Sequence, residues 1–372
     1  MMPILVVNSG SSSVKYQVQD VDSGDSLLEG LVERVTDHDE AFRAMFAEIA
    51  DSQIELSAVG HRVVHGGAKF SSPTVISEEV LAEIEALVPL APLHNPGNLA
   101  GIRAARAAFP GLLQVAVFDT AFHQTMPASS YRYAIDQKLE KRYGVRKYGF
   151  HGTSYAFVAK QSAKFLGIEQ QDLNAVILHL GNGASACAVK SGRSFNTSMG
   201  MTPLQGLVMG TRSGDIDPGI IFYLANEAGL SNAEIDKMLN AESGLKGLTG
   251  ISDMRDISAL AVAKDPVAQE ALEIYTQRVR HYLGAYFAEL GRPDAIVFTA
   301  GVGENSAEIR SMICANLKAL GIEIDEDLNQ AMAKDNRDIS LLGSRVRVLV
   351  IPTNEELEIA NQTAALLKEG RA

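Results

Sequence analysis

The sequence lacks tryptophan and has only two cysteines, Cys187 and Cys314, among its 372 residues. The two cysteines are far apart and do not have the spacing of metal ligands, so a disulfide framework is not indicated and a reducing compartment is expected. No segment approaches the roughly 20 consecutive apolar residues that a membrane span needs. The short apolar run near the N-terminus has no basic segment before it, so it does not resemble a signal peptide. We therefore expect a cytoplasmic protein that does not bind membranes.

The chain has little positive charge relative to negative charge, with a formal net charge of −12. Such a surface repels nucleic acid and anionic lipid, so neither is expected as a partner. Small anionic substrates are repelled as well. If the substrates are anions, local arginine, lysine and helix N-termini must attract them.

What is present is a long chain with 46% hydrophobic residues, which suits two domains. Apolar strands alternate with helical patterns, and this predicts an α/β architecture with helix-covered sheets. A strand at 2–7 followed by a Gly/Ser/Asn turn and a returning strand recurs at 175–192, which suggests an internal duplication. A second similarity, between 112–123 and 294–310, suggests that these two strand-to-turn segments also correspond.

Several segments have helical periodicity. Ser77 is expected to cap one of them, with two glutamates in its first turn. The expected helices lie near 38–50, 77–88, 97–108, 153–166, 217–228 and 265–290, with a terminal amphipathic helix after 354.

Three strand ends contain glycine: NSGSSSVK (8–15), HLGNGAS (179–185) and TAGVGEN (299–305). Glycine lets the backbone approach a phosphate, and the N–H groups of a tight turn can bind an anion. Each segment alone is more simply an ordinary turn, but three of them together favour nucleotide binding. A Walker A motif is absent, and none of the three fits the dinucleotide-binding pattern.

Two arginines have unusual surroundings, because Arg62 lies among apolar residues and Arg212 lies in a Gly-flanked loop. A buried arginine needs an anionic partner. Either arginine could therefore bind a substrate or form a structural ion pair, in the case of Arg212 with Asp215 or Asp217.

Acidic residues and histidines supply further candidates. Asp119 ends a strand and Glu355 opens the last helix, although a buried cap and a helix N-terminal charge are equally ordinary explanations. His151 precedes a helix expected to start at Thr153, where it could contact an anion. For His61, His65 and His123 a core position with backbone hydrogen bonds is the simpler interpretation.

Taken together, these segments resemble the acetate kinase family of the acetate and sugar kinase/Hsc70/actin superfamily. The matching strings include NSGSSSVKY, GHRVVHGG, PLHNP, VFDTAFH, YGFHGTS, HLGNGAS, MTPLQGLVMGTRSGDIDPG, SDMRDI, TAGVGENS and PTNEE, from residue 8 to 356. The resemblance implies two duplicated RNase H-like domains flanking a cleft. It places residues 1–123 and 357–372 in the N-terminal domain and 124–356 in the nucleotide-binding C-terminal domain.

The resemblance also implies an activity: reversible, direct in-line transfer of the ATP γ-phosphoryl group to acetate, with ADP and acetyl phosphate as products. It implies Mg²⁺ as the cofactor, with Mn²⁺ as a substitute, and a homodimer. Asp119, His151 and Arg212 would be catalytic, and Asn8 and Glu355 would hold the metal. The expected substrate-site residues are Arg62, Lys15, Val64, Leu93, Phe150 and Pro203. The expected nucleotide-site residues are Lys15, His179, Leu180, Gly181, Asn182, Gly183, Asp253, Met254, Arg255, Gly301, Val302, Gly303, Glu304 and Asn305.

The sequence departs from the family pattern at Tyr155, where the family usually has a second histidine after YGFHGTS. The sequence also leaves other functions open. One methylene changes binding by only about 1–3 kcal/mol, so a propionate or other short-chain acyl kinase is the main alternative. A non-catalytic, nucleotide-gated protein of the same superfamily is a remote one, because it would not need a carboxylate site.

Overall fold

The computed structural model describes residues 1–10, 13–33, 38–331 and 333–370, so Ser11 and Ser12 of the first Gly-containing segment lie outside the described residues. Two six-stranded sheets organise this part of the chain, in the orders β3-β2-β1-β4-β6-β5 and β11-β12-β10-β7-β8-β9. The first sheet contains β1 (Pro3–Ser9), β2 (Ser13–Asp20), β3 (Ser26–Glu33), β4 (Ala58–Val63), β5 (Thr74–Val75) and β6 (Leu113–Phe118). The second contains β7 (Ala175–Leu180), β8 (Ala184–Lys190), β9 (Arg193–Thr197), β10 (Ala295–Thr299), β11 (Arg337–Asp338) and β12 (Arg347–Val350).

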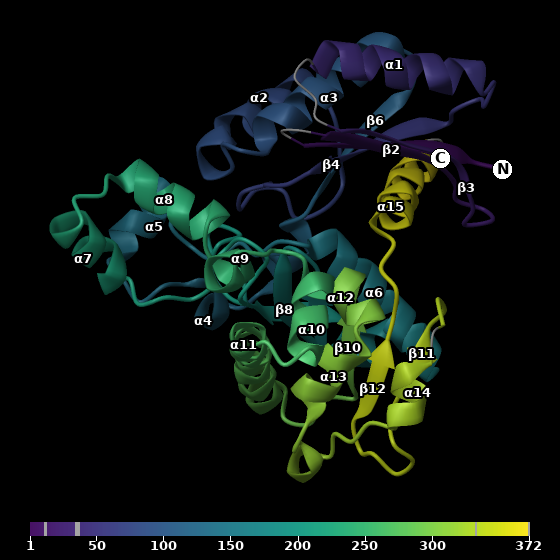
Figure 1. Cartoon of the computed structure of the whole chain (residues 1–372). Helices are drawn as coiled ribbons and strands as arrows, with labels where there is room; N and C mark the ends of the chain where they lie inside the picture. Colours follow the sequence, from purple (N-terminus) through teal and green to yellow (C-terminus); the bar gives the residue numbers. More distant parts are fainter. Residues whose placement is uncertain (11–12, 34–37, 332, 371–372) are drawn as a thin grey trace.

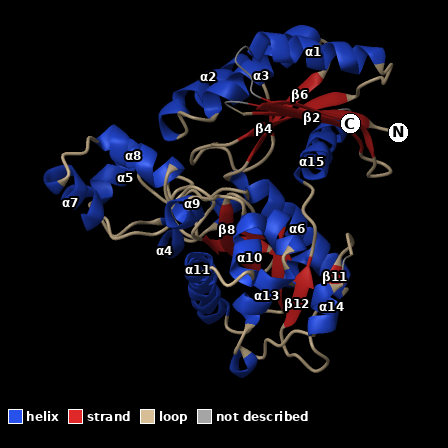
Figure 2. Cartoon of the chain, viewed as in Figure 1, coloured by secondary structure: helices blue, strands red, loops and turns tan. Residues whose placement is uncertain are grey.

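Helices surround both sheets (Figure 2). In the first half of the chain they are α1 (His38–Asp51), α2 (Glu78–Ala86), α3 (Asn95–Ala108), α4 (Ala128–Tyr131), α5 (Gln137–Tyr143) and α6 (Gly152–Leu166). In the second half they are α7 (Gly219–Glu227), α8 (Asn232–Ala241), α9 (Gly244–Thr249), α10 (Met254–Val262), α11 (Pro266–Leu290), α12 (Ala300–Asn305), α13 (Ala307–Cys314), α14 (Glu326–Gln330) and α15 (Glu355–Glu369). Short 3₁₀ helices lie at Val88–Leu90, Ala121–Thr125, Gln170–Asp172 and Lys318–Leu320.

The helices expected from periodicity are present, and Ser77 caps α2 through the Val80 amide as predicted. The sequence did not indicate α4, α5, α8, α9, α10 and α14. His151 itself occupies the N-cap of α6, in a left-handed conformation with φ 59°, so this helix begins one residue before the expected Thr153.

The two sheets have the same topology, which confirms the internal duplication and the α/β class. In each sheet a three-stranded antiparallel meander (β1–β3, β7–β9) is followed by two parallel strands and a short antiparallel edge strand. The second proposed correspondence is wrong. The strand at 295–299 takes the position of β4, and β6 corresponds instead to β12. Buried parallel strands all read as apolar runs ending in polar turns, so this pattern does not distinguish one of them from the next.

Each sheet is sandwiched between helices, and the two domains are joined by crossing helices. In the upper domain of Figure 1, α1 and α3 cover one face of the first sheet and α15 covers the other. In the lower domain, α11 packs on β8 and β7, and α6 packs on β7. The helix α6, which comes after β6 and the short α4 and α5, thus covers the second sheet, while α15, the helix that follows β12, returns to the first. The N-terminal ends of both crossing helices consequently lie between the domains.

Candidate active site

Asn8, Arg62 and Asp119 are brought together by strand geometry. They end or follow β1, β4 and β6, which are adjacent parallel strands. Side chains alternate between the faces of a sheet. Ile4 and Val6 pack against α15. Asn8 is two residues further along β1, so its side chain points to the same face of the sheet. Because the same alternation applies to the other two strands, all three polar side chains lie on the α15 face, beside Glu355 at the start of that helix.

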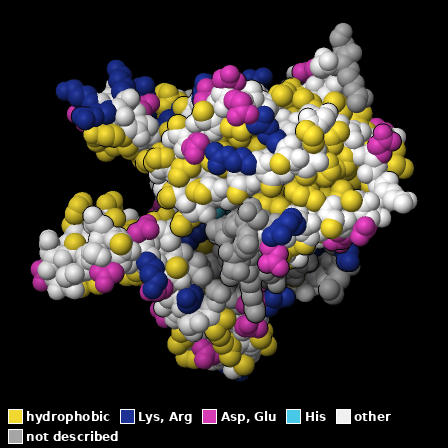
Figure 3. Space-filling model, turned by 90° about the horizontal axis from the view of Figure 1, so that it is seen from above, with side chains coloured by type: hydrophobic (Ala, Val, Ile, Leu, Met, Phe, Trp, Pro, Cys, Tyr) yellow, Lys and Arg dark blue, Asp and Glu magenta, His cyan; other side chains and the backbone are white. Residues whose placement is uncertain are grey.

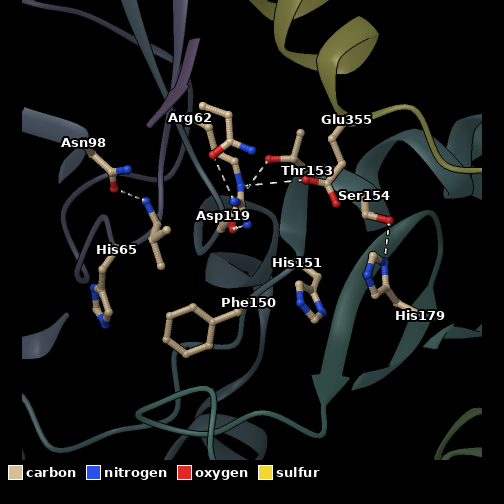
Figure 4. Close-up of polar contacts among 12 residues, drawn as sticks. Arg62, His65, Asn98, Asp119, Phe150, His151, Thr153, Ser154, His179 and Glu355 are labelled. Carbon is tan, nitrogen blue, oxygen red and sulfur yellow. Dashed lines mark hydrogen bonds and ion pairs between the residues drawn. The ribbon is translucent and has the colours of Figure 1, made fainter. Parts of the chain in front are cut away.

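The guanidinium of Arg62 is the centre of this cluster (Figure 4). Its Nη2 and Nε atoms donate to Asp119 Oδ2 and Oδ1 at 2.6 and 3.1 Å, and its Nη1 donates to Asn8 Oδ1 at 3.3 Å. An arginine has five N–H groups, so two remain after these three bonds, one on each Nη atom. Asp119 therefore holds Arg62 in place. Two N–H groups of Arg62 have no partner among the described residues and can donate to a second carboxylate.

Glu355 completes the acidic side of the cluster. Its Oε2 lies 3.7 Å from Arg62 Nε, and Lys15 Nζ pairs with the adjacent Glu356 at 2.5 Å. Burial raises the pKa of Glu355 to about 7, with repulsion from Asp119 and Glu356 adding to this shift and the charge of Arg62 opposing it. These carboxylates thus concentrate negative charge at a partly dehydrated site, as a cation site requires.

His151 and His179 stack across the cluster from Arg62, with ring centroids 4.1 Å apart. His179 Nδ1 is hydrogen-bonded to Ser154 Oγ at 2.8 Å, and His151 Nδ1 to Ser185 Oγ at 2.9 Å. Burial lowers the pKa of His151 well below 6.5 and that of His179 to about 3, with nearby positive charge contributing to both shifts. Both imidazoles are consequently neutral near pH 7.

Arg212 has no carboxylate partner among the described residues. Its Nη1 donates to the Pro203 carbonyl at 3.0 Å, and burial lowers its pKa. The acids considered from the sequence are engaged elsewhere, because Asp215 bonds Tyr282 and the Gly206 amide, and Asp217 bonds the Gly219 amide. The structural ion pair considered for Arg212 is therefore wrong, and its charge remains available to a bound anion.

Gly183 marks the point on which Arg212 and His151 converge. A Cβ atom built at Gly183 would lie 3.6 Å from His151 Nε2 and 3.7 Å from Arg212 Nη2. The Arg212 guanidinium and the His151 imidazole therefore face the same space beside Gly183. A phosphoryl group bound in this space would meet both side chains.

Four of the expected substrate-site residues are only partly brought together: Val64, Leu93, Phe150 and Pro203. Val64 and Phe150 are buried in one hydrophobic cluster although they are far apart in the sequence. The Pro203 carbonyl accepts a hydrogen bond from Arg212. Leu93, in contrast, is 65% exposed.

A cavity of about 1210 Å³ lies in the second domain beside α10 and α12. It unites several expected nucleotide-site residues: Gly181, Asn182, Asp253, Met254, Arg255, Gly301, Val302, Glu304 and Asn305. His179, Leu180, Gly183 and Gly303 do not line it. The wall also includes residues that the sequence did not indicate, among them Ser252, Arg310, Lys334 and Arg337. These come from separate segments with no common motif.

Other residues of the site were missed because their neighbours are remote in sequence. His94 is close enough to Arg62 and Arg212 for both charges, together with burial, to lower its pKa. Thr153 donates to Asp119 at 3.2 Å, and Thr353 is hydrogen-bonded to Ser154 at 2.8 Å. His94 stands in the PLHNP string, which resembles the family, but the hydroxyl groups of Thr153 and Thr353 give no comparable signal.

His61, His65 and His123 are core residues, as expected. His61 is hydrogen-bonded to the side chain of Gln114 at 2.7 Å rather than to the backbone, and His123 Nε2 to the Phe150 carbonyl at 2.9 Å. His65 Nδ1 accepts from the Gly67 amide, although its Nε2 has no partner among the described residues.

Two features are absent from the described residues. None of their helices is long and apolar enough to cross a bilayer. No group of three or more histidine, cysteine or acidic side chains among them could hold a metal ion by itself.

A duplicated sheet topology with crossing helices, together with an anion-binding centre between the domains, defines a kinase of the actin and sugar-kinase fold. The model of the acetokinase family matches residues 3–48 and 35–361, and the chain belongs to this family. It is 53% identical to an acetate kinase of Streptomyces coelicolor over 98% of this chain and 97% of that protein.

Solved structures agree with this assignment. An acetate kinase of Porphyromonas gingivalis superposes with a TM-score of 0.95 at 40% identity, covering 99% of this chain and all of that one. A propionate kinase of Francisella tularensis superposes with a TM-score of 0.93 at 43% identity, covering 98% of this chain and all of that one.

Proposed function

We propose that this protein is an acetate kinase, which transfers the γ-phosphoryl group of ATP reversibly to acetate. The observation that carries the proposal is the pair of arginines. Arg62 retains two donors for a carboxylate, and Arg212, without an acidic partner among the described residues, faces the same space beside Gly183 as His151. Two anions must meet in this reaction, and two cationic donors from different domains are suited to hold them.

The nucleophile needs no base, because acetate is already ionised near neutral pH. Arg62 would bind its carboxylate through both free N–H groups, which orients one oxygen toward the γ-phosphorus. As this oxygen forms its bond, the bond from the γ-phosphorus to the β,γ-bridging oxygen breaks and ADP leaves. Arg212 and neutral His151 would stabilise the equatorial oxygens of the transferred group. Asp119 would hold Arg62 rather than remove a proton.

The residues present also fit a magnesium ion. Asn8, Asp119 and Glu355 offer hard oxygen atoms in one cluster, and Mg²⁺ commonly takes one or two carboxylates and keeps several waters. When bound, the ion would neutralise phosphate charge. We propose Asn8 and Glu355 as its holders; Mn²⁺ has the same ligand preference.

We place the nucleotide in the cavity of the second domain. The Gly181–Gly183 turn leads from this cavity toward Arg212, which would direct the γ-phosphate to the space beside Gly183. Asp253 and Arg255 form an exposed ion pair at the cavity wall and would contact the nucleoside end.

We place the alkyl group of the acid beside Val64 and Phe150, which are buried in the same hydrophobic cluster. The relatives include a propionate kinase, so a somewhat larger acid is the second candidate. The decisive experiment incubates the enzyme with MgATP, hydroxylamine and acetate, propionate or butyrate, and measures the acyl hydroxamate. Acetate should give the highest kcat/KM. If propionate exceeds acetate, the substrate assignment changes, and if no acid reacts, the kinase proposal fails.

We also propose a cytoplasmic homodimer with domains at 1–123 plus 357–372 and 124–356. The support for self-association is α7, in which no residue is buried although Ile220, Phe222 and Tyr223 are apolar or aromatic. Figure 3 shows hydrophobic side chains on the two projections at the left, the side where Figure 1 places α5, α7 and α8. An apolar helix that buries none of its residues against the rest of the described chain is typical of a subunit interface.

A further inference from the structure

Tyr155, the residue that departs from the family pattern, is fully buried in the second domain. It lies on α6, one turn after the N-cap residue His151. Its hydroxyl is hydrogen-bonded to Ser185 Oγ at 2.5 Å, and the same Ser185 oxygen is hydrogen-bonded to His151 Nδ1 at 2.9 Å. A chain of two hydrogen bonds therefore runs from the buried Tyr155 hydroxyl through Ser185 to the His151 imidazole, which faces the space beside Gly183.

Which group donates in each of these hydrogen bonds follows from asking which acceptor each hydroxyl proton has. If Ser185 donated to Tyr155, the tyrosine proton would have no acceptor among the described residues in a fully buried position. If Tyr155 donates to Ser185, the Ser185 proton is free to point at His151 Nδ1, and each hydroxyl proton has an acceptor.

From this arrangement we infer that Tyr155 is a positioning residue, which acts through Ser185 to fix His151 as the tautomer protonated on Nε2. The inference rests on the proposed function, since it concerns how His151 meets the transferred phosphoryl group. An Nε2–H group points a donor into the space shared with Arg212 and Gly183. The other tautomer would point a lone pair at an anion and repel it.

The test compares Tyr155→Phe, Ser185→Ala and the double variant. We expect each single variant to lower kcat about three- to tenfold, the range of one oriented hydrogen bond, while the KM for MgATP and acetate changes less than about twofold. The double variant should lose no more than either single one, because both break the same chain. In a His151→Ala background, Tyr155→Phe should have no further effect.

A matched control separates positioning from packing. Tyr286 is also buried in the second domain, but its hydroxyl has no hydrogen-bond partner in the described part of the chain. Tyr286→Phe therefore removes a tyrosine hydroxyl without affecting the hydrogen bonds among Tyr155, Ser185 and His151. Its kcat should equal that of the wild type. Thermal melts of all variants report whether any loss comes from unfolding.

A second measurement does not depend on turnover. Nitrogen-15 NMR of histidine-labelled enzyme, with His151 assigned by its substitution, should show protonated Nε2 and unprotonated Nδ1, and Ser185→Ala should populate the other tautomer. Protonated Nδ1 in the wild type, or wild-type kcat in Tyr155→Phe, would overturn the inference. If the wild type phosphorylates no carboxylic acid, the proposed function fails instead, while the tautomer still decides the direction of the chain.

Discussion

Asp119 binds Arg62 through both carboxylate oxygens, at 2.6 and 3.1 Å, across the ends of two adjacent parallel strands. This leaves the outer N–H groups of Arg62 for the substrate. Arg62→Lys keeps the charge but loses the planar pair of donors. We expect the KM for acetate to rise at least about tenfold, which corresponds to about 1.4 kcal/mol, with little change for MgATP. Steady-state kinetics with each substrate varied checks this, and equal effects on both KM values would contradict it.

Arg212 should show opposite effects on activity and stability. Arg212→Ala removes the charge that faces the phosphoryl space, so kcat should fall by about 10³–10⁵, as in related transfers. A buried cation without an acidic partner opposes folding, so the variant should be at least as stable as the wild type. Turnover and urea unfolding measured together test this, and a strongly destabilised variant would show that Arg212 is structural.

Gly183→Ala places a methyl group in the space between His151 and Arg212. The variant should fold normally but lose turnover by more than about tenfold, since a group displaced from productive geometry reacts much more slowly. Gly284→Ala, in α11, is the control variant. A Cβ atom at position 284 would have no other atom within 4 Å. Nucleotide binding by calorimetry should survive in both, and unchanged kcat in Gly183→Ala would remove the phosphoryl group from this space.

The buried histidines should make the protein sensitive to acid. The pKa values of His61 and His123 are lowered to about 4 by burial, whereas an unfolded histidine titrates near 6.5. The unfolded chain therefore binds more protons as pH falls below 6.5, so stability declines from there toward 4. Each residue should cost on the order of 2 kcal/mol at pH 5. Urea midpoints between pH 7 and 5 measure the decline, which should be smaller for His61→Gln.

Introducing a negative charge on α7 tests whether this helix forms the proposed dimer interface. Phe222→Asp on α7 should yield monomers in light scattering, because a carboxylate buried in an apolar interface is unfavourable. Val262, on α10, is also exposed, at 76%, and Val262→Asp should leave the mass unchanged. A dimeric Phe222→Asp variant, or a monomeric wild type, would exclude α7 as the interface.

The sequence alone determined the α/β class, the duplicated hairpins and the main helices, because these depend on local periodicity. It also identified the family, because Arg62, His151 and Arg212 stand in distinctive strings. It misassigned the counterpart of residues 294–310, since buried parallel strands have similar patterns whatever their place in a sheet.

Only the tertiary structure decided which charges are paired. Asp119 and Arg62 meet because β4 and β6 are neighbours, and Arg212 is without an acid because Asp215 and Asp217 bond elsewhere. It also linked Tyr155 to His151 through Ser185, which comes from another segment. Such contacts depend on the register and direction of elements far apart in the chain, and sequence spacing does not encode these relations locally.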